Sequence, residues 1–85
     1  MVRVEVSGHC ATVVMDMIAA EWKLPLHAMN EVAQLFSLVD PKGKNWWNIN
    51  GCYNYIRRVP VDVAEAVAAR LVRIAEACRP PATLR

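Results

Sequence analysis

Several features that commonly identify a function are scarce in this chain of 85 residues. Its three cysteines, Cys10, Cys52 and Cys78, form no Cys-x-x-Cys pair, which argues against a secreted disulfide framework and against a structural zinc site. No apolar run approaches the ~18 residues that a membrane span needs. No signal-peptide-type apolar segment follows Arg3 near the N-terminus. We therefore expect a cytoplasmic protein without a membrane partner.

Residue patterns that support catalysis are also scarce. His9 and Cys10 are adjacent, and adjacent residues rarely reach the geometry of a base and a nucleophile. The chain has three glycines but no Gly-rich phosphate loop, no serine-nucleophile motif and no carboxylate pair in an apolar setting. We predict no catalytic or metal-binding residues, no cofactor and no small-molecule substrate, and hence a protein that is not an enzyme.

The length of the chain predicts one domain over residues 1–85, because two domains would each be too short to fold unaided. Hydrophobic residues make up 55% of the sequence, which is more than a thin core can bury. This excess predicts a homodimer or a bound partner.

Most of the chain has helical periodicity. Residues 2–6 alternate strictly and predict a short strand, which needs a partner strand such as its own copy in a dimer. Apolar spacing predicts four helices, over residues 10–23, 26–39, 48–58 and 62–78. Asp62 and Glu65 have the spacing of a capping box for the last helix, and we expect residues 79–85 to form a flexible tail. The predicted fold is mainly α, a small four-helix domain with a short N-terminal β-strand.

The middle of the chain is locally basic, since residues 41–61 contain four Lys and Arg residues and no Asp or Glu. In the predicted helix 48–58, an apolar stripe leaves asparagine and arginine on the opposite face. Asparagine can pair with adenine and arginine with guanine in the major groove of DNA, and lysines ahead of the helix can reach phosphates. The candidate DNA-binding residues are Lys42, Lys44, Asn48, Asn50, Asn54, Tyr55, Arg57 and Arg58.

Part of this pattern resembles a known family. Residues 53–58, Tyr-Asn-Tyr-Ile-Arg-Arg, are followed by Val-Pro-Val at 59–61, and residues 31–35 read Glu-Val-Ala-Gln-Leu. Over about residues 12–77 the chain thereby resembles phage Cro/repressor-type helix-turn-helix proteins. The resemblance implies a helix-turn-helix fold and a phage or bacterial transcription regulator that reads double-stranded DNA with helix 48–58. The sequence departs from the family pattern at two places. It has Ser37 where the turn of the family usually has glycine, and its segment 40–47 is longer than that turn.

A second hypothesis uses nearly the same residues. Trp, Tyr and Arg dominate the energetics of protein–protein interfaces. A small non-enzymatic inhibitor or adaptor would dock on a larger protein through Trp46, Trp47, Tyr55, Arg57 and Arg58. One of the two tryptophans is expected in the core and the other as an exposed anchor.

Two further interpretations are weaker. The same aromatic residues can stack single-stranded bases, although no sheet platform is predicted. The N-terminal strand followed by helices resembles ribbon-helix-helix repressors, with Arg3 and Glu5 facing outward, but pairing of the strand at a dimer interface fits its few donors better.

Overall fold

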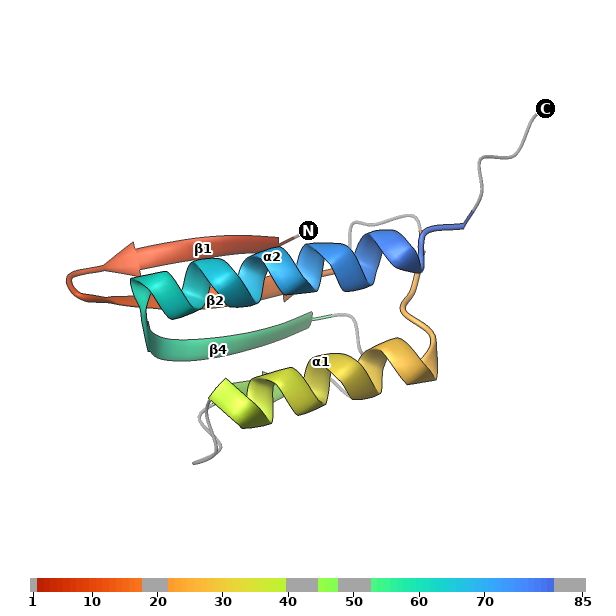
Figure 1. Cartoon of the computed structure of the whole chain (residues 1–85), viewed down its shortest axis with the longest axis horizontal. Coiled ribbons are helices and arrows are strands. Elements are labelled where there is room, and N and C mark those ends of the chain that lie inside the picture. The colour runs from red at the N-terminus through yellow and green to blue at the C-terminus, as the bar shows by residue number, and fades with distance from the viewer. Residues whose placement is uncertain (1, 18–21, 40–44, 48–52, 81–85) are drawn as a thin grey trace.

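The computed structural model describes residues 2–17, 22–39, 45–47 and 53–80. The elements follow one another as two strands, a helix, two strands and a helix: β1 (Val2–Ser7), β2 (Cys10–Asp16), α1 (Leu26–Val39), β3 (Asn45–Trp47), β4 (Tyr53–Pro60) and α2 (Val61–Ala77). The strands form one antiparallel sheet in the order β1-β2-β4-β3 (Figure 1). The prediction of a four-helix, helix-turn-helix domain is therefore wrong, and the fold is α+β.

The first two strands form a tight hairpin. Ser7 pairs with Cys10 across a two-residue turn, in which Gly8 has φ +64°. A positive φ at the first turn position is typical of a type II′ turn, whose twist matches that of the strands. The predicted helix 10–23 is thus wrong over 10–17 and 22–23, and residues 18–21 lie outside the described residues. Residues 12–14 include three β-branched side chains, Thr-Val-Val, which fit a pleated strand better than a helix.

Strand β4 occupies much of the segment predicted as the helix 48–58. Its residues 53–58 pair with β2 and β3, which corrects that prediction, while residues 48–52 lie outside the described residues. Tyr53, Tyr55 and Ile56 are residue types that favour strands. The spacing of these residues also fits the period of an α-helix, so periodicity alone predicted a helix where the chain forms a strand.

The two remaining predicted helices are confirmed with small changes of boundary. Helix α1 begins after Pro25, whose carbonyl oxygen accepts hydrogen bonds from the N–H groups of Ala28 and Met29, each at 3.0 Å. Helix α2 follows Pro60 directly. No side-chain hydrogen bond caps its start, so the predicted capping box of Asp62 is wrong.

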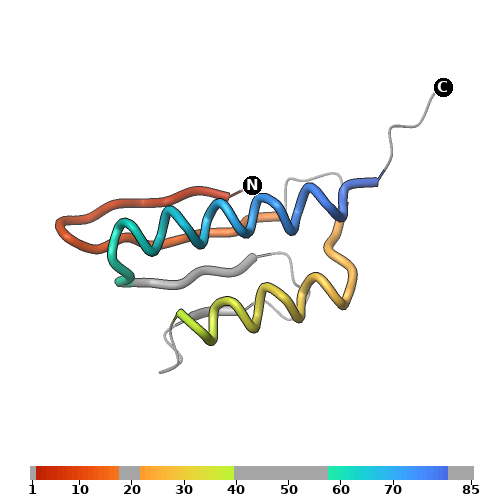
Figure 2. The backbone as a smooth tube through the Cα atoms, in the orientation of Figure 1, coloured from red at the N-terminus to blue at the C-terminus, as the bar shows by residue number. Residues whose placement is uncertain are grey.

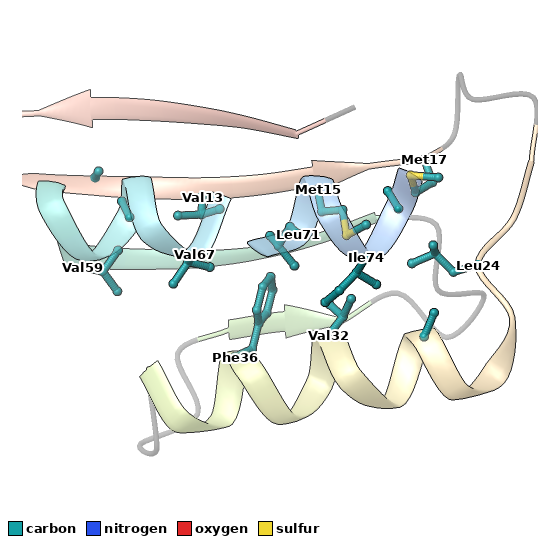
Figure 3. Packing of buried hydrophobic residues seen from close by; sticks show 14 residues of the cluster. Val13, Met15, Met17, Leu24, Val32, Phe36, Val59, Val67, Leu71 and Ile74 are labelled. Carbon is teal, nitrogen blue, oxygen red and sulfur yellow. The ribbon is translucent and has the colours of Figure 1, made fainter. Parts of the chain in front are cut away.

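The core lies between the sheet and the two helices. Helix α2 packs on β1, β2 and β4, and α1 packs against α2 (Figures 1 and 2). Leu71 of α2 and Val13 of β2 are fully buried, and Phe36 of α1 is buried beside them (Figure 3). The other labelled members of this core are Met15, Met17, Leu24, Val32, Val59, Val67 and Ile74.

Both helices cover the same side of the sheet, here named the inner face. Its residues on the hairpin are Val2, Val4, Val6, Ala11, Val13 and Met15. The opposite side is named the outer face. By the strand register it comprises Arg3, Glu5, Ser7, Cys10, Thr12, Val14, Asp16, Trp46, Tyr53 and Tyr55. Within the described residues, no helix or strand packs on the outer face, because the sheet residues of the shared core all belong to the inner face.

Candidate binding face

One row of residues crosses all four strands of the outer face. Arg3 pairs with Val14, Val14 with Tyr55, and Tyr55 with Trp46. Directly paired residues of antiparallel strands share a face, so the register brings a cation, an aliphatic residue and two aromatic residues into one line. Tyr53 joins the same face two residues along β4, opposite Asp16. The pairing thus collects three aromatic residues on the side of the sheet that the helices leave uncovered.

Val14 gives this face an apolar centre. Its exposed fraction is 2%, yet it is not part of the hydrophobic core, which contains its neighbours Val13 and Met15. Alternation along a strand sends successive side chains to opposite faces, so Val14 is buried on the outer side. Val14 is therefore already covered in the single chain, and a partner would contact the residues around it rather than Val14 itself.

The charges of the outer face near β1 are mutually paired. The Nε of Arg3 donates to Oε2 of Glu5 at 2.8 Å, and its Nη1 lies 4.0 Å from Oδ2 of Asp16. Arg3 and Glu5 are about half exposed, so these pairs contribute little to stability. Because one arginine faces two carboxylates, this part of the face is acidic rather than basic.

A bulge places a second cation at the other end of the face. Arg57 and Arg58 lie opposite the single residue Thr12, where the register of β2 and β4 shifts. Arg58 has φ +58°, a left-handed conformation that costs a side-chain-bearing residue about 1 kcal/mol. Its exposed side chain borders a hollow of about 430 Å³. The hollow is lined by Glu5, Ser7, Cys10, Ala11, Thr12 and Arg58.

The predicted site residues separate into three groups. Lys42, Lys44, Asn48 and Asn50 lie outside the described residues. Tyr55 and Trp46 belong to the outer face, whereas Asn54 pairs with Trp47 and Met15 on the inner face. Arg57 and Arg58 lie at the bulge. The asparagine and arginine residues of 54–58 therefore do not share one helical face, and the two tryptophans belong to opposite faces of the sheet.

Sequence reasoning missed the contributions of the hairpin to this face. The sequence analysis predicts a helix that includes Thr12, Val14 and Asp16. It therefore does not recognise that these alternate residues lie on one face of a strand. The combination of Ser7-Gly8-His9 with the β-branched run after it was the available signal for a hairpin.

Other kinds of site find no support within the described residues. No group of three or more His, Cys, Asp or Glu side chains is placed to hold a metal ion there. Cys10 and Cys78 are free thiols. Among the helices of the described ranges, none combines the length and apolar character needed to cross a membrane.

Comparison with family models, with curated proteins and with solved structures finds no match for this protein.

Proposed function

We propose that this protein is a non-enzymatic binding protein that docks on another protein through the outer face of its sheet. The observation that carries the proposal is the row Arg3–Val14–Tyr55–Trp46 on the uncovered face. Trp, Tyr and Arg are the residue types that are enriched in interface hot spots. A four-stranded sheet backed by two helices supplies a rigid platform for them.

The chemistry of the outer face defines the partner. The aromatic row fits an apolar patch on the partner's surface. Arg58, which forms no ion pair with any described residue, fits a carboxylate that enters the hollow beside Ser7 and Thr12. Glu5 also borders the hollow, but its carboxylate is engaged by Arg3. The partner is therefore a protein surface that combines apolar residues with an Asp, a Glu or a terminal carboxylate.

Nucleic-acid binding is the second candidate function, and one observation favours it. Aromatic residues on an open four-stranded antiparallel sheet can stack unpaired bases, as in several RNA-binding modules. The carboxylates of Glu5 and Asp16 lie on the same face and repel phosphates. We rank a protein partner first for this reason. The predicted groove-reading helix 48–58 does not form over residues 53–58, which belong to β4.

The proposal can be tested by site-specific photocrosslinking of the full-length protein in cells. A photoreactive phenylalanine at Tyr55 is expected to capture the partner, and the same group at Leu38, which is 81% exposed on α1, is the matched control. The captured protein is then purified and its affinity for the unmodified protein is measured. Trp46→Ala, Tyr55→Ala and Arg58→Ala should each weaken binding about tenfold or more, and Leu38→Ala should leave it unchanged.

Two results would overturn this proposal. One is affinity for the purified partner that the three outer-face substitutions leave unchanged. The other is tight binding of a labelled single-stranded or duplex oligonucleotide that weakens steeply with salt and is lost in Tyr55→Ala, which would establish the nucleic-acid function instead.

A further inference from the structure

Strand β1 ends the sheet on one side and has few of the features that protect an edge. In the described part of the protein, β2 pairs with one side of β1 and no strand pairs with the other (Figure 1). Natural edge strands are commonly blocked by proline, a bulge or lysine. β1 has none of these, and its six residues alternate regularly as Val-Arg-Val-Glu-Val-Ser. Such an edge is competent to pair with another strand.

The hairpin turn determines which backbone groups face that open edge. A two-residue turn closes on a hydrogen-bonded pair, here Ser7 and Cys10, and such pairs recur at every second residue. The N–H and C=O groups of Arg3, Glu5 and Ser7 are therefore directed to β2. Those of Val2, Val4 and Val6 are directed away from the sheet.

The sequence of β1 is complementary to itself in the antiparallel direction. When two copies are aligned with Val4 opposite Val4, Val2 of each copy faces Val6 of the other, and Arg3 faces Glu5. Paired residues share a face, so all valines fall on the inner face and all charges on the outer face. The outward backbone groups of Val2, Val4 and Val6 then meet in hydrogen-bonded pairs.

Neighbouring registers lack this match. Alignment about Arg3 sets the two arginines directly opposite each other, and alignment about Glu5 does the same with the two glutamates. Like charges in directly opposed positions destabilise a strand pair. A shift by one residue would place valines of one copy on the face that carries the charges of the other. The charge pattern therefore selects the register centred on Val4.

Exposed apolar side chains lie on the same flank of the molecule. Val6 is 59% exposed although it belongs to the inner face. On α2, Arg70 and Ile74 line a hollow with α1, and Val72 lies about 200° around the helix from Arg70. β1 and α1 lie on opposite sides of α2 (Figure 1). Val72 therefore lies on the side of α2 away from α1, and it is 41% exposed.

We propose that two copies of this protein form a dimer by antiparallel pairing of their β1 strands about Val4. The pairing joins both sheets into one continuous sheet. It covers Val6 of each copy with Val2 of the other. It also replaces the exposed Arg3–Glu5 ion pair within each copy by ion pairs between the two copies. The two outer faces then lie on the same side of the joined sheet. This inference rests on β1 and the exposed valines beside it, and it does not depend on the proposed function.

The test uses two charge variants of the full-length protein. Arg3→Glu gives a β1 with two acids, and Glu5→Arg gives one with two bases, so each alone would oppose like charges across the interface. The wild type is expected to dimerise in sedimentation velocity experiments at micromolar concentrations. Each variant alone should dimerise about tenfold or more weakly, and an equimolar mixture of the two should form a heterodimer. Loss of the ion pair within a single copy cannot produce rescue by mixing.

A third variant tests the backbone pairing. Val6→Pro removes an outward N–H while leaving the groups that pair with β2, so the monomer should remain folded by circular dichroism and the dimer should be weakened. Glu31→Arg on α1, an exposed acid remote from β1, is the matched control for a charge reversal and should dimerise normally. A wild type that stays monomeric overturns the proposal. So does a dimer that persists in Arg3→Glu, Glu5→Arg and Val6→Pro, or a mixture that does not associate.

Discussion

The two faces of the sheet bury neighbouring residues of β2 in different surroundings. Val13 and Met15 are fully buried under α1 and α2 and belong to the hydrophobic core. Val14 lies between them in sequence and is also buried, but on the outer face, with Thr12 and Asp16 as its nearest outer-face residues along the strand. The comparison shows that low exposure alone does not identify the core of a small sheet protein. The inner face stabilises the fold, whereas the outer face carries the residues suited to binding.

The largest effect is expected where the inner face meets α1. Phe36→Ala removes a ring that is 2% exposed, and we expect it to lower the free energy of unfolding by about 3–5 kcal/mol. Leu38→Ala on the same helix, where the side chain is 81% exposed, should change it by less than about 0.5 kcal/mol. Urea unfolding followed by circular dichroism measures both. A similar cost for the two variants would contradict the packing of α1.

The same substitution on adjacent residues compares the faces directly. Val13→Thr places a hydroxyl in the apolar core and should cost about 1–3 kcal/mol. Val14→Thr places it beside Arg3, Thr12 and Asp16 on the outer face, where polar partners exist, and should cost less than about 1 kcal/mol. Chemical denaturation measures the free energy of unfolding of both variants. An equal loss for Val13→Thr and Val14→Thr would show that the two faces do not differ in polarity around these residues.

Two positions with positive φ, one in the hairpin turn and one at the bulge, should respond in opposite directions. Gly8→Ala at φ +64° meets no neighbouring atom, so its cost is conformational and should be about 1 kcal/mol. Arg58→Gly at φ +58° relieves the same strain and should raise the free energy of unfolding by about 0.5–1 kcal/mol. Thermal unfolding measures the two shifts.

Arg58→Gly also separates stability from binding. It should weaken binding of the partner, because the guanidinium that borders the hollow is lost. If the variant is more stable and binds the partner with unchanged affinity, Arg58 does not contribute to binding.

The smallest effect is expected at the exposed charges of the outer face. Glu5→Gln loses the 2.8 Å ion pair with Arg3, in which both side chains are about half exposed. The free energy of unfolding of the monomer should change by less than about 0.5 kcal/mol. The measurement is made at a protein concentration too low for association. A change above about 1.5 kcal/mol would show that this pair supports the fold itself.

Local signals were sufficient for three elements. The alternation of residues 2–6 predicted β1, and the apolar stripes of 26–39 and 62–78 predicted α1 and α2. In the structure the two helices begin directly after Pro25 and Pro60. In these segments residue preference, periodicity and terminating residues all favour one structure.

The segments 10–16 and 53–58 were ambiguous because two periods fit the same apolar residues. In each case β-branched or aromatic residues favoured a strand, but an isolated strand has no stability of its own. β2 is held by β1 on one side and by β4 on the other, and the second partner lies about forty residues away in the sequence. This long-range pairing is absent from any local window.

For the candidate site, the residue types can be read directly from the sequence: aromatic and arginine residues in the segment 46–58, and self-complementary charges in β1. The pairing of the strands was needed to show that Trp46, Tyr55, Val14 and Arg3 form one row. The folded chain also showed that Asn54 belongs to the opposite face and that Arg58 lies at a bulge beside a hollow. Side chains alternate across a strand, so the face on which each residue lies depends on the register between strands that are distant in sequence.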